Sequence, residues 1–215
     1  MPRDQELAQG IIRGDRESVV RLTREELDAG REAVGILNEG LIPGMDVLGE
    51  RFARGEAFIP ELMAAAKAMN AAMEILRPLL EASGVESLGK VVMGTVKGDM
   101  HDIGKNLVCM MLRGAGFEVI DLGVNAGAER FIQAIEESGA RLLGMSALLT
   151  TTMSRMGGII EEIRKSRAGA GVRIAVGGAP LDLAYANKIG ADGYAKDATV
   201  AVECFKGLVA ALRTP

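Results

Sequence analysis

Up to residue 82, hydrophobic positions recur three or four residues apart among charged ones, which is the period of an amphipathic helix. The pattern predicts three helices, over residues 3–13, 16–29 and 31–52. Pro43-Gly44 is expected to kink or break the third of them. A fourth helix is expected to start at Pro60, which suits a first helical position, with Glu61 complementing the positive end of its dipole. These elements predict a small four-helix bundle.

The period changes after a predicted linker at 83–89, SGVESLG. Five short runs then have the character of strands: KVVMGTV, FEVIDLGV, ARLLGMSAL, VRIAVGG and DGYA. Helical stretches follow them, at 103–115, 127–138, 152–166, 181–189 and 198–212. Alternating strands and helices are typical of a parallel sheet covered on both faces. The predicted fold is therefore a helical bundle over residues 1–83, followed by a Rossmann-like or flavodoxin-like domain with a five-stranded parallel sheet over 89–215.

Small residues gather where the predicted strands end. Glycines at such places let the main chain approach a ligand closely, and open α/β sheets bind ligands outside the carboxyl ends of their strands. We therefore expect a large, flat or deep-reaching ligand at this edge. The residues concerned are Gly98, Gly104, Gly123, Ser146, Gly177, Gly178 and Gly193.

Missing motifs and charge balance narrow the choice of ligand. The first predicted strand–helix turn contains no GxGxxG and the chain no GxxxxGK[ST], which argues against NAD and ATP. FMN suits the fold, although aromatic residues make up only 3% of the chain. A net charge of −4 with interspersed signs predicts neither a nucleic-acid partner nor a membrane partner.

The same sequence predicts a cytoplasmic location. The first ten residues are charged rather than hydrophobic, and no uncharged run is long enough to span a bilayer. Cys109 and Cys204 are scattered without a zinc or disulfide pattern, as expected of buried thiols in a reducing compartment.

His101, within GTVKGDMHDIGKN, is the only histidine among 215 residues. A lone histidine is often structural. Its predicted place, after the first strand and two residues from Asp99, also suits a metal ligand whose second ring nitrogen donates to a carboxylate. One histidine does not hold a bare zinc ion, which takes three or four protein ligands. It suits a metal whose other positions are filled by a macrocycle.

The spacing of three motifs resembles that of a known family. The pattern DxHxxG at 99–104 is followed after 41 residues by SxL at 146–148, and after 28 more by GG at 177–178. This resembles the cobalamin-binding domain of methionine synthase and of the corrinoid proteins of methyltransferase systems. The segment LIPGMDVLGERFARGEAFIPELMAAAKAM looks like the helical cap that precedes this domain in the methyl-transferring members.

The resemblance implies a cofactor and a set of roles. Cobalamin or a related corrinoid would bind with its lower base detached (base-off) and with His101 as the axial cobalt ligand (His-on). Asp99 would accept a hydrogen bond from the imidazole, and Thr152, where the family often has serine, would extend this relay. A hydroxyl at residue 152 also suits capping of its own helix, so both interpretations stay open. The other implied cofactor-binding residues are Gly98, Met100, Asp102, Ile103, Gly104, Ser146, Leu148, Thr150, Gly177 and Gly178.

In the cap, Phe52, Ile59 and Leu62 match positions that cover the upper face of the corrin in the family. Hydrophobic residues at helical spacing are equally expected in the core of a bundle, and that alternative stays open too.

The implied function is that of a corrinoid carrier protein, without turnover on its own. It would accept a methyl group on cobalt from a donor bound to a methyltransferase barrel and pass it to tetrahydrofolate or a thiol on a second methyltransferase, with a reductive activase as a further partner. The chain is too short to contain a barrel of about 250 residues itself. Methanol, methylamines, methoxylated aromatics and quaternary amines all stay open as donors. The alternative function is a stand-alone cobalamin-binding sensor.

Overall fold

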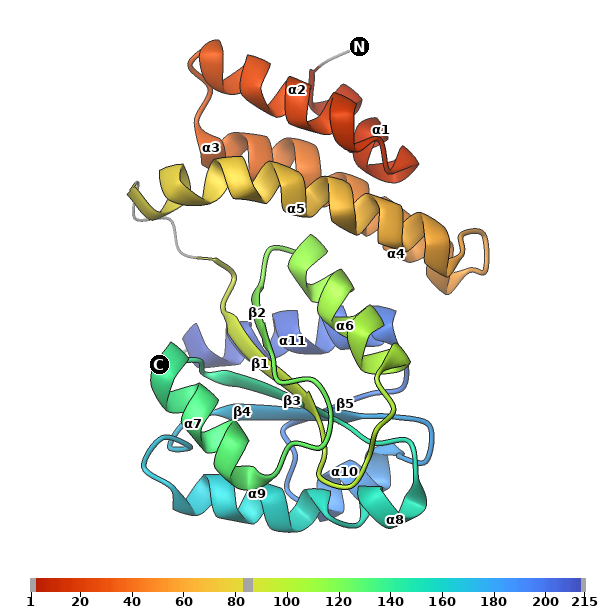
Figure 1. Cartoon of the computed structure of the whole chain (residues 1–215), viewed down its shortest axis with the longest axis vertical. Helices are drawn as coiled ribbons and strands as arrows, with labels where there is room; N and C mark the ends of the chain where they lie inside the picture. Colours follow the sequence, from red (N-terminus) through yellow and green to blue (C-terminus); the bar gives the residue numbers. More distant parts are fainter. Residues whose placement is uncertain (1–2, 83–86, 214–215) are drawn as a thin grey trace. The chain divides into compact units, whose positions relative to one another are not determined.

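The computed structural model describes residues 3–82 and 87–213. The chain divides into two compact units, one of Met1–Ser87 with Arg113–Gly116, the other of Leu88–Leu112 with Phe117–Pro215. The predicted linker at 83–89 overlaps residues 83–86, which lie outside the described residues, and the predicted domain boundaries at 83 and 89 stay predictions. The helices of the first unit are α1 (Arg3–Arg13), α2 (Arg16–Asp28), α3 (Ala33–Gly35), the π-helix η1 (Ile36–Leu41), α4 (Ile42–Ala53) and α5 (Ile59–Ala82) (Figure 1).

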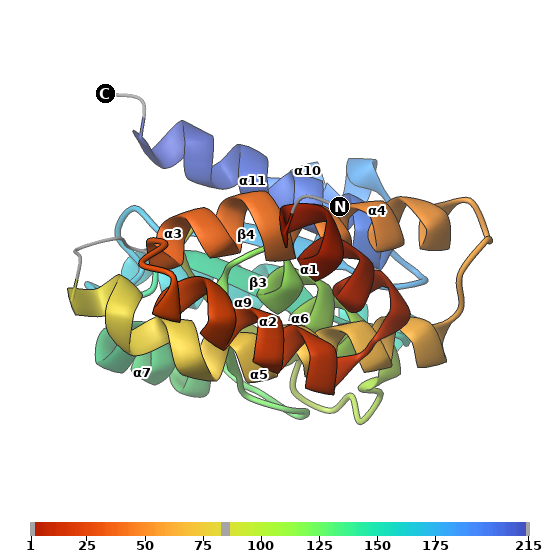
Figure 2. The same ribbon diagram turned by 90° about the horizontal axis from the view of Figure 1, so that it is seen from above.

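The first unit is a helical bundle with an aliphatic core. Helix α1 packs against α2, η1, α4 and α5, and α2 packs against α5 (Figure 2). The side chains buried among them are aliphatic, including Leu7, Ile11, Leu22, Leu48 and Leu76. This agrees with the predicted bundle, in which hydrophobic positions three and four residues apart form one face of each helix.

The interruption predicted at Pro43 takes the form of a change in helix type. Segments α3, η1 and α4 follow one another directly, and the N–H of Ile42 bonds to the carbonyl of Leu37, five residues earlier. Proline has no N–H, and its ring crowds the carbonyl four residues before it in an α-helix. The wider π turn before Pro43 relieves this contact, so the helical path continues through the proline.

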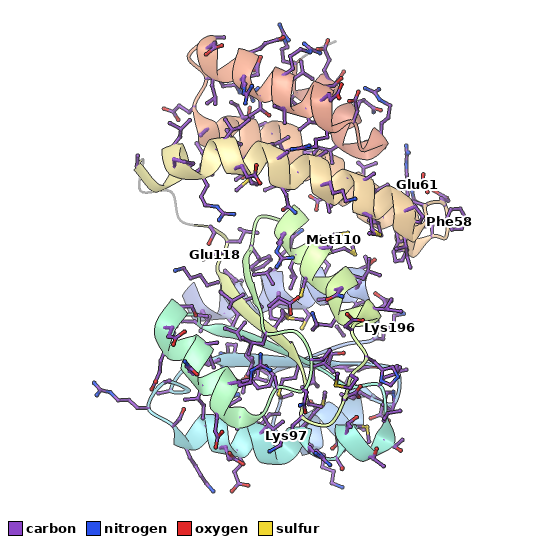
Figure 3. All side chains as sticks on the ribbon, in the orientation of Figure 1. Phe58, Glu61, Lys97, Met110, Glu118 and Lys196 are labelled. Atoms are coloured by element: carbon purple, nitrogen blue, oxygen red, sulfur yellow. The ribbon has the colours of Figure 1, made fainter. Side chains whose placement is uncertain are left out.

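Helix α5 begins close to the predicted place. The carboxylate of Glu61 accepts a hydrogen bond of 2.8 Å from the N–H of Phe58, one of the donors that a helix start leaves without an intrahelical partner. Both residues lie at the same end of α5 (Figure 3). Pro60 is the second helical residue, where a missing N–H costs nothing.

The second unit contains a five-stranded parallel sheet in the order β2-β1-β3-β4-β5. Its strands are β1 (Lys90–Thr95), β2 (Glu118–Asp121), β3 (Leu142–Ser146), β4 (Arg173–Gly177) and β5 (Gly193–Ala195). Its helices are α6 (Ile103–Gly114), α7 (Ala128–Ser138), α8 (Thr150–Met153), α9 (Met156–Lys165), α10 (Leu183–Lys188) and α11 (Ala198–Arg213). This is a flavodoxin-like order, and with the helical bundle it confirms the predicted fold class.

Helices cover both faces of the sheet, as the continuous hydrophobic strands predicted. On one face, side chains of α7, α9 and α10 form a single buried cluster with the strands, in which Phe131 and Ile160 are members. Helices α6 and α11 lie on the other face (Figure 1). There is no room for a side chain at Gly94, because a Cβ there would lie 2.8 Å from the ring of Phe131. The carboxyl ends of β1, β3 and β4 are thus held side by side, which positions the loops that follow them.

Two details differ from the sequence prediction. The helix expected over 152–166 is divided into α8 and α9. Gly193 starts β5 and so lies at its amino end, away from the edge where we expected it. A Cβ at Gly193 would come within 2.5 Å of the sulfur of Cys204, so its small size serves the packing of α11 on the sheet.

Within residues 3–82 and 87–213, every helix is too short or too polar to cross a lipid bilayer.

Candidate functional site

The candidate site begins in the loop that leaves β1. After Thr95 the chain turns tightly, with the N–H of Asp99 donating to the carbonyl of Val96 at 3.0 Å. Gly98 permits this turn because its φ is +86°, a conformation that L-residues rarely adopt. Any Cβ there would also lie 2.9 Å from the guanidinium of Arg155. The loop therefore delivers Asp99 and His101 to the carboxyl edge of the sheet.

The carboxylate of Asp99 is fully buried and accepts hydrogen bonds on both oxygens. Oδ1 lies 2.7 Å from Nδ1 of His101 and accepts the His101 N–H at 3.0 Å. Oδ2 accepts the hydroxyl of Thr152 at 2.6 Å and the N–H of Leu148 at 2.8 Å. With the N–H of Leu149, 3.4 Å from Oδ2, five donors from residues 101 and 148–152 converge on one buried carboxylate, which brings together residues that the sequence placed in separate motifs.

These contacts keep the carboxylate ionised. Burial raises the pKa of Asp99, but the hydrogen bonds from Thr152, from the N–H groups of Leu148 and His101, and from the imidazole outweigh it and hold that pKa well below its usual range. An ionised carboxylate only accepts hydrogen bonds, so Nδ1 of His101 carries the proton. The lone pair of the imidazole is then on Nε2, the nitrogen that is able to bind a metal.

The imidazole is presented to the outside within an apolar rim. The side chain of His101 is 51% exposed although its partner Asp99 is buried. Large hydrophobic side chains from the same two segments of the chain are exposed too, and exposed apolar surface that forms a patch often marks a binding site. They are Met100, Ile103, Leu148 and Leu149. At Gly104, a Cβ would meet nothing within 4 Å, so the start of α6 borders open space.

This donor set fits a metal that brings a large, partly apolar ligand of its own. No group of three or more His, Cys, Asp or Glu residues able to hold a bare ion occurs in the part of the chain that the structure describes. A single imidazole nitrogen surrounded by exposed hydrophobic side chains suits the axial position of a macrocycle.

The remaining residues of the sheet unit that were predicted to bind the cofactor lie at or just after the ends of β3 and β4. Ser146 and Gly177 are register partners on adjacent strands, and Thr150 is exposed at the start of α8. A Cβ at Gly178, where φ is +131°, would overlap the carbonyl of Ala147, and one at Gly177 would lie 2.8 Å from the carbonyl of Ala195. Close main-chain packing alone therefore requires both glycines, whatever binds beside them.

The three predicted cap residues differ in exposure. Leu62 is fully buried, Phe52 is half-buried and Ile59 is exposed. Complete burial is what the bundle-core alternative expects of Leu62. The two others retain surface that a ligand or partner can cover, as does the neighbouring Phe58, which is 67% exposed.

The sequence prediction missed three residues that hold this loop. Nζ of Lys105 lies 2.6 Å from Oδ1 and 2.7 Å from Oδ2 of Asp121. Asn125, at a φ of 55°, accepts the Gly98 N–H on its side chain at 2.8 Å and donates its own N–H to the carbonyl of Asp99. Polar residues at and just after the end of a strand were the available signal for two of them, since Asp121 ends β2 and Asn125 lies four residues further on.

The fold and this sheet edge define a B12-binding protein. Residues 89–203 match a family described as "B12 binding domain", and residues 4–77 match a second family with the same description. A corrinoid protein of Desulfitobacterium hafniense strain Y51 is 42% identical over 92% of this chain and 93% of its own. The dimethylamine corrinoid protein of Methanosarcina barkeri is also 42% identical, over 96% and 97%. The chain belongs to the corrinoid proteins of methyltransferase systems.

A solved structure agrees over nearly the whole chain. The crystal structure of the methanol:cobalamin methyltransferase complex of Methanosarcina barkeri contains a chain that matches with a TM-score of 0.80 and 29% identity. The match covers 97% of this chain and 80% of that one. These relationships confirm the predicted resemblance and the predicted cobalamin-type cofactor. The protein is a methyl-carrying corrinoid protein, and methyltransferases are its partners.

Proposed function

We propose that Nε2 of His101 is the lower axial ligand of the corrinoid cobalt, with the lower base of the corrinoid detached. The observation that carries this proposal is the half-exposed imidazole whose Nδ1 lies 2.7 Å from a buried, ionised carboxylate. This contact selects the tautomer in which Nε2 is free to bind metal. Within the described residues no hydrogen-bond partner occupies Nε2.

When bound, the corrinoid supplies a cobalt atom that accepts a methyl group and gives it up again. The chain's own residues orient the imidazole and hold its proton. Asp99 keeps the proton on Nδ1 of His101 while Nε2 serves as ligand. The same carboxylate would also stabilise an imidazole ring that carried a proton on both nitrogens. Thr152 and the N–H of Leu148 hold Asp99 in place.

The cofactor contacts proposed for the sheet unit are the loop residues beside His101 and the ends of β3 and β4. Met100, Ile103 and Leu148 present exposed apolar surface that suits the corrin ring. The small residues at the ends of the strands leave space that suits the nucleotide tail of the corrinoid. The complete proposed set is Gly98, Met100, Asp102, Ile103, Gly104, Ser146, Leu148, Thr150, Gly177 and Gly178. In the helical unit, Phe52 and Ile59 are the proposed cover of the upper face, while the fully buried Leu62 is assigned to the bundle core.

The proposed partners are a barrel methyltransferase that holds the donor, a second methyltransferase that holds tetrahydrofolate or a thiol, and a reductive activase. One relative named for dimethylamine is 42% identical to this chain, and one named for trimethylamine is 41% identical. The chain matched in the methanol complex is 29% identical. A methylated amine is therefore the first donor to test. A cytoplasmic location stays a prediction.

The test uses the corrinoid-loaded protein reduced to cobalt(II). Its electron paramagnetic resonance spectrum should carry hyperfine splitting from one imidazole nitrogen, and His101→Ala should lose that splitting while keeping the corrinoid. An unchanged spectrum in His101→Ala would falsify the ligand assignment. Methyl transfer is then assayed with purified barrel proteins for methylated amines and for methanol. If the spectrum is normal but no methyl transfer occurs with either barrel protein or with any acceptor protein, the sensor alternative is favoured.

A further inference from the structure

Lys105 has a buried charge that the proposed function leaves without a role. It stands in the first turn of α6, four residues after His101, and its side chain is 0% exposed. An ammonium group in such a place is unfavourable unless every one of its three hydrogens has an acceptor.

All three acceptors are present. Nζ of Lys105 lies 2.6 Å and 2.7 Å from the two oxygens of Asp121, at the end of β2, and 2.6 Å from Oδ1 of Asn106. Oδ1 of Asp121 also accepts the N–H of Gly123 at 2.8 Å. The pair thus joins the start of α6 to the carboxyl end of β2.

From this pair, hydrogen bonds lead back to the histidine loop. The side chain of Asn106 donates to Oδ2 of Asp102 at 3.0 Å, and the Asn106 N–H donates to the Asp102 carbonyl at 2.7 Å. Asp102 directly follows His101, whose own carbonyl accepts the hydroxyl of Thr95 at 2.9 Å. Two hydrogen-bond networks therefore meet at His101. One contacts its ring through Asp99, and the other reaches the following residue, Asp102, from Lys105.

We propose that Lys105 is a positioning residue, and that its pair with Asp121 fixes the loop 99–102 so that the imidazole of His101 keeps one orientation. Buried ion pairs often contribute little to stability compared with hydrophobic replacements, and in some proteins their role is to specify one geometry. The role in cobalt ligation rests on the proposed function. The effect on imidazole orientation does not, and it is measurable without the cofactor.

The variants separate geometry from stability. Lys105→Met keeps the length of the side chain and removes its charge. Lys105→Met with Asp121→Asn removes both charges and retains an acceptor for the Gly123 N–H. Asn106→Ala keeps the Lys105–Asp121 pair but removes the side-chain bond to Asp102 and one of the three acceptors of Lys105. The matched control is Lys165→Met, because Lys165 forms an equally short pair with Glu161, at 2.6 Å, on the exposed surface of the same unit.

The first readout is the nitrogen NMR spectrum of untagged, full-length protein labelled with 15N-histidine. With one histidine in 215 residues, the spectrum contains one imidazole, so its two nitrogen shifts report His101 alone. In the wild-type protein and in Lys165→Met, we expect one set of shifts for a ring protonated on Nδ1. In Lys105→Met, in the double variant and in Asn106→Ala, the shifts should move towards the average of the two tautomers.

The second readout is the cobalt(II) spectrum of the loaded protein, in which the ratio of imidazole-ligated to unligated cobalt should fall about tenfold in Lys105→Met, as for other supporting partners of metal ligands. Unfolding midpoints are measured in parallel. The proposal is overturned if Lys105→Met keeps both wild-type readouts, or if the double variant restores both together with its stability. If Lys105→Met does not fold, wild-type shifts in both the double variant and Asn106→Ala overturn it. If the cobalt(II) spectrum of the wild-type protein lacks splitting from an imidazole nitrogen, the proposed function is contradicted. The 15N shifts would still decide the role of Lys105.

Discussion

Oγ1 of Thr152 lies 2.6 Å from Oδ2 of Asp99, and both side chains are buried. The same hydroxyl lies 3.0 Å from the carbonyl of Leu149, within its own turn. A hydroxyl has a single proton, and a carboxylate at the shorter distance is the stronger acceptor. Thr152 therefore donates first to Asp99, and its bond to the Leu149 carbonyl in its own turn is the weaker of the two contacts.

Thr152→Val should destabilise the protein because it keeps the shape of the side chain and leaves a buried carboxylate oxygen short of one donor. We expect the free energy of unfolding to fall by about 1–3 kcal/mol, measured by urea denaturation. Thr152→Ser restores the hydroxyl and should recover most of the loss. Equal stability of the Val and Ser variants would show that the hydroxyl does not support Asp99.

Asn125 should be replaceable only by residues that tolerate its main-chain conformation and accept a hydrogen bond. Its φ of 55° disfavours most L-residues, and its Oδ1 accepts the Gly98 N–H. Asn125→Asp keeps both properties, Asn125→Gly keeps only the conformation, and Asn125→Ala keeps neither. Thermal unfolding should rank the three variants in that order, with Ala about 1–3 kcal/mol below the wild type. An Ala variant as stable as the Asp variant would show that the Asn125 side chain does not hold the Gly98–Asp99 segment.

The ionised carboxylate of Asp192 should stabilise the folded protein, and this stabilisation should be lost at low pH. Burial raises the pKa of Asp192, but hydrogen bonds from the Ile174 N–H, from Arg164 and from Arg173 outweigh it and lower that pKa. The unfolded chain takes up this proton at a higher pH than the folded protein does. The stabilisation is therefore complete above the unfolded pKa of about 4 and is lost as the pH falls through the folded value.

The comparison is between the wild type and Asp192→Asn, by urea denaturation from pH 6 down to about pH 2.5. Above pH 4 the variant should be the less stable of the two, and the difference should shrink below it. Parallel curves over the whole range would show that the carboxylate has the same affinity for its proton in both states.

Leu62 and Phe52 should behave differently when truncated, because one is fully buried and the other half-buried. Leu62→Ala should lower the free energy of unfolding by about 2–5 kcal/mol, as expected of a core leucine. Phe52→Ala should cost less and keep one corrinoid per chain, while photolysis of the methylated cofactor gains yield. Loss of the cofactor or unfolding in Phe52→Ala would assign Phe52 to the core.

How far the sequence predicts this molecule depends on whether a feature is local in the chain. Strand and helix positions follow from hydrophobic period, and the element boundaries lie within a few residues of those expected. His101 and Asp99 are two residues apart, so their contact is visible as a motif. Thr152 is 53 residues from Asp99 and entered the prediction only through the family resemblance.

The features that were missed depend on three-dimensional register. Lys105 and Asp121 are 16 residues apart, and their pairing requires the parallel alignment of β1 with β2 and the placement of α6 across them. Gly193 was assigned to the wrong edge because the sequence pattern does not show whether a glycine in so short a strand begins the strand or ends it. The π-helix before Pro43 has no periodicity signal, since it changes the hydrogen bonding of only a few residues.

That π-helix lets the chain contain one extra residue without changing which way the side chains of the following helix point. A π turn holds one residue more than an α turn without rotating the helix that follows it, so Ile36–Leu41 amounts to an insertion that the fold has absorbed. One residue deleted from that segment would leave an ordinary α-helix, with Leu48 still turned towards the core. Pro43 would then crowd the carbonyl four residues before it, at a cost of about 3 kcal/mol, so replacing that proline by a residue with an N–H should recover stability in the shorter chain.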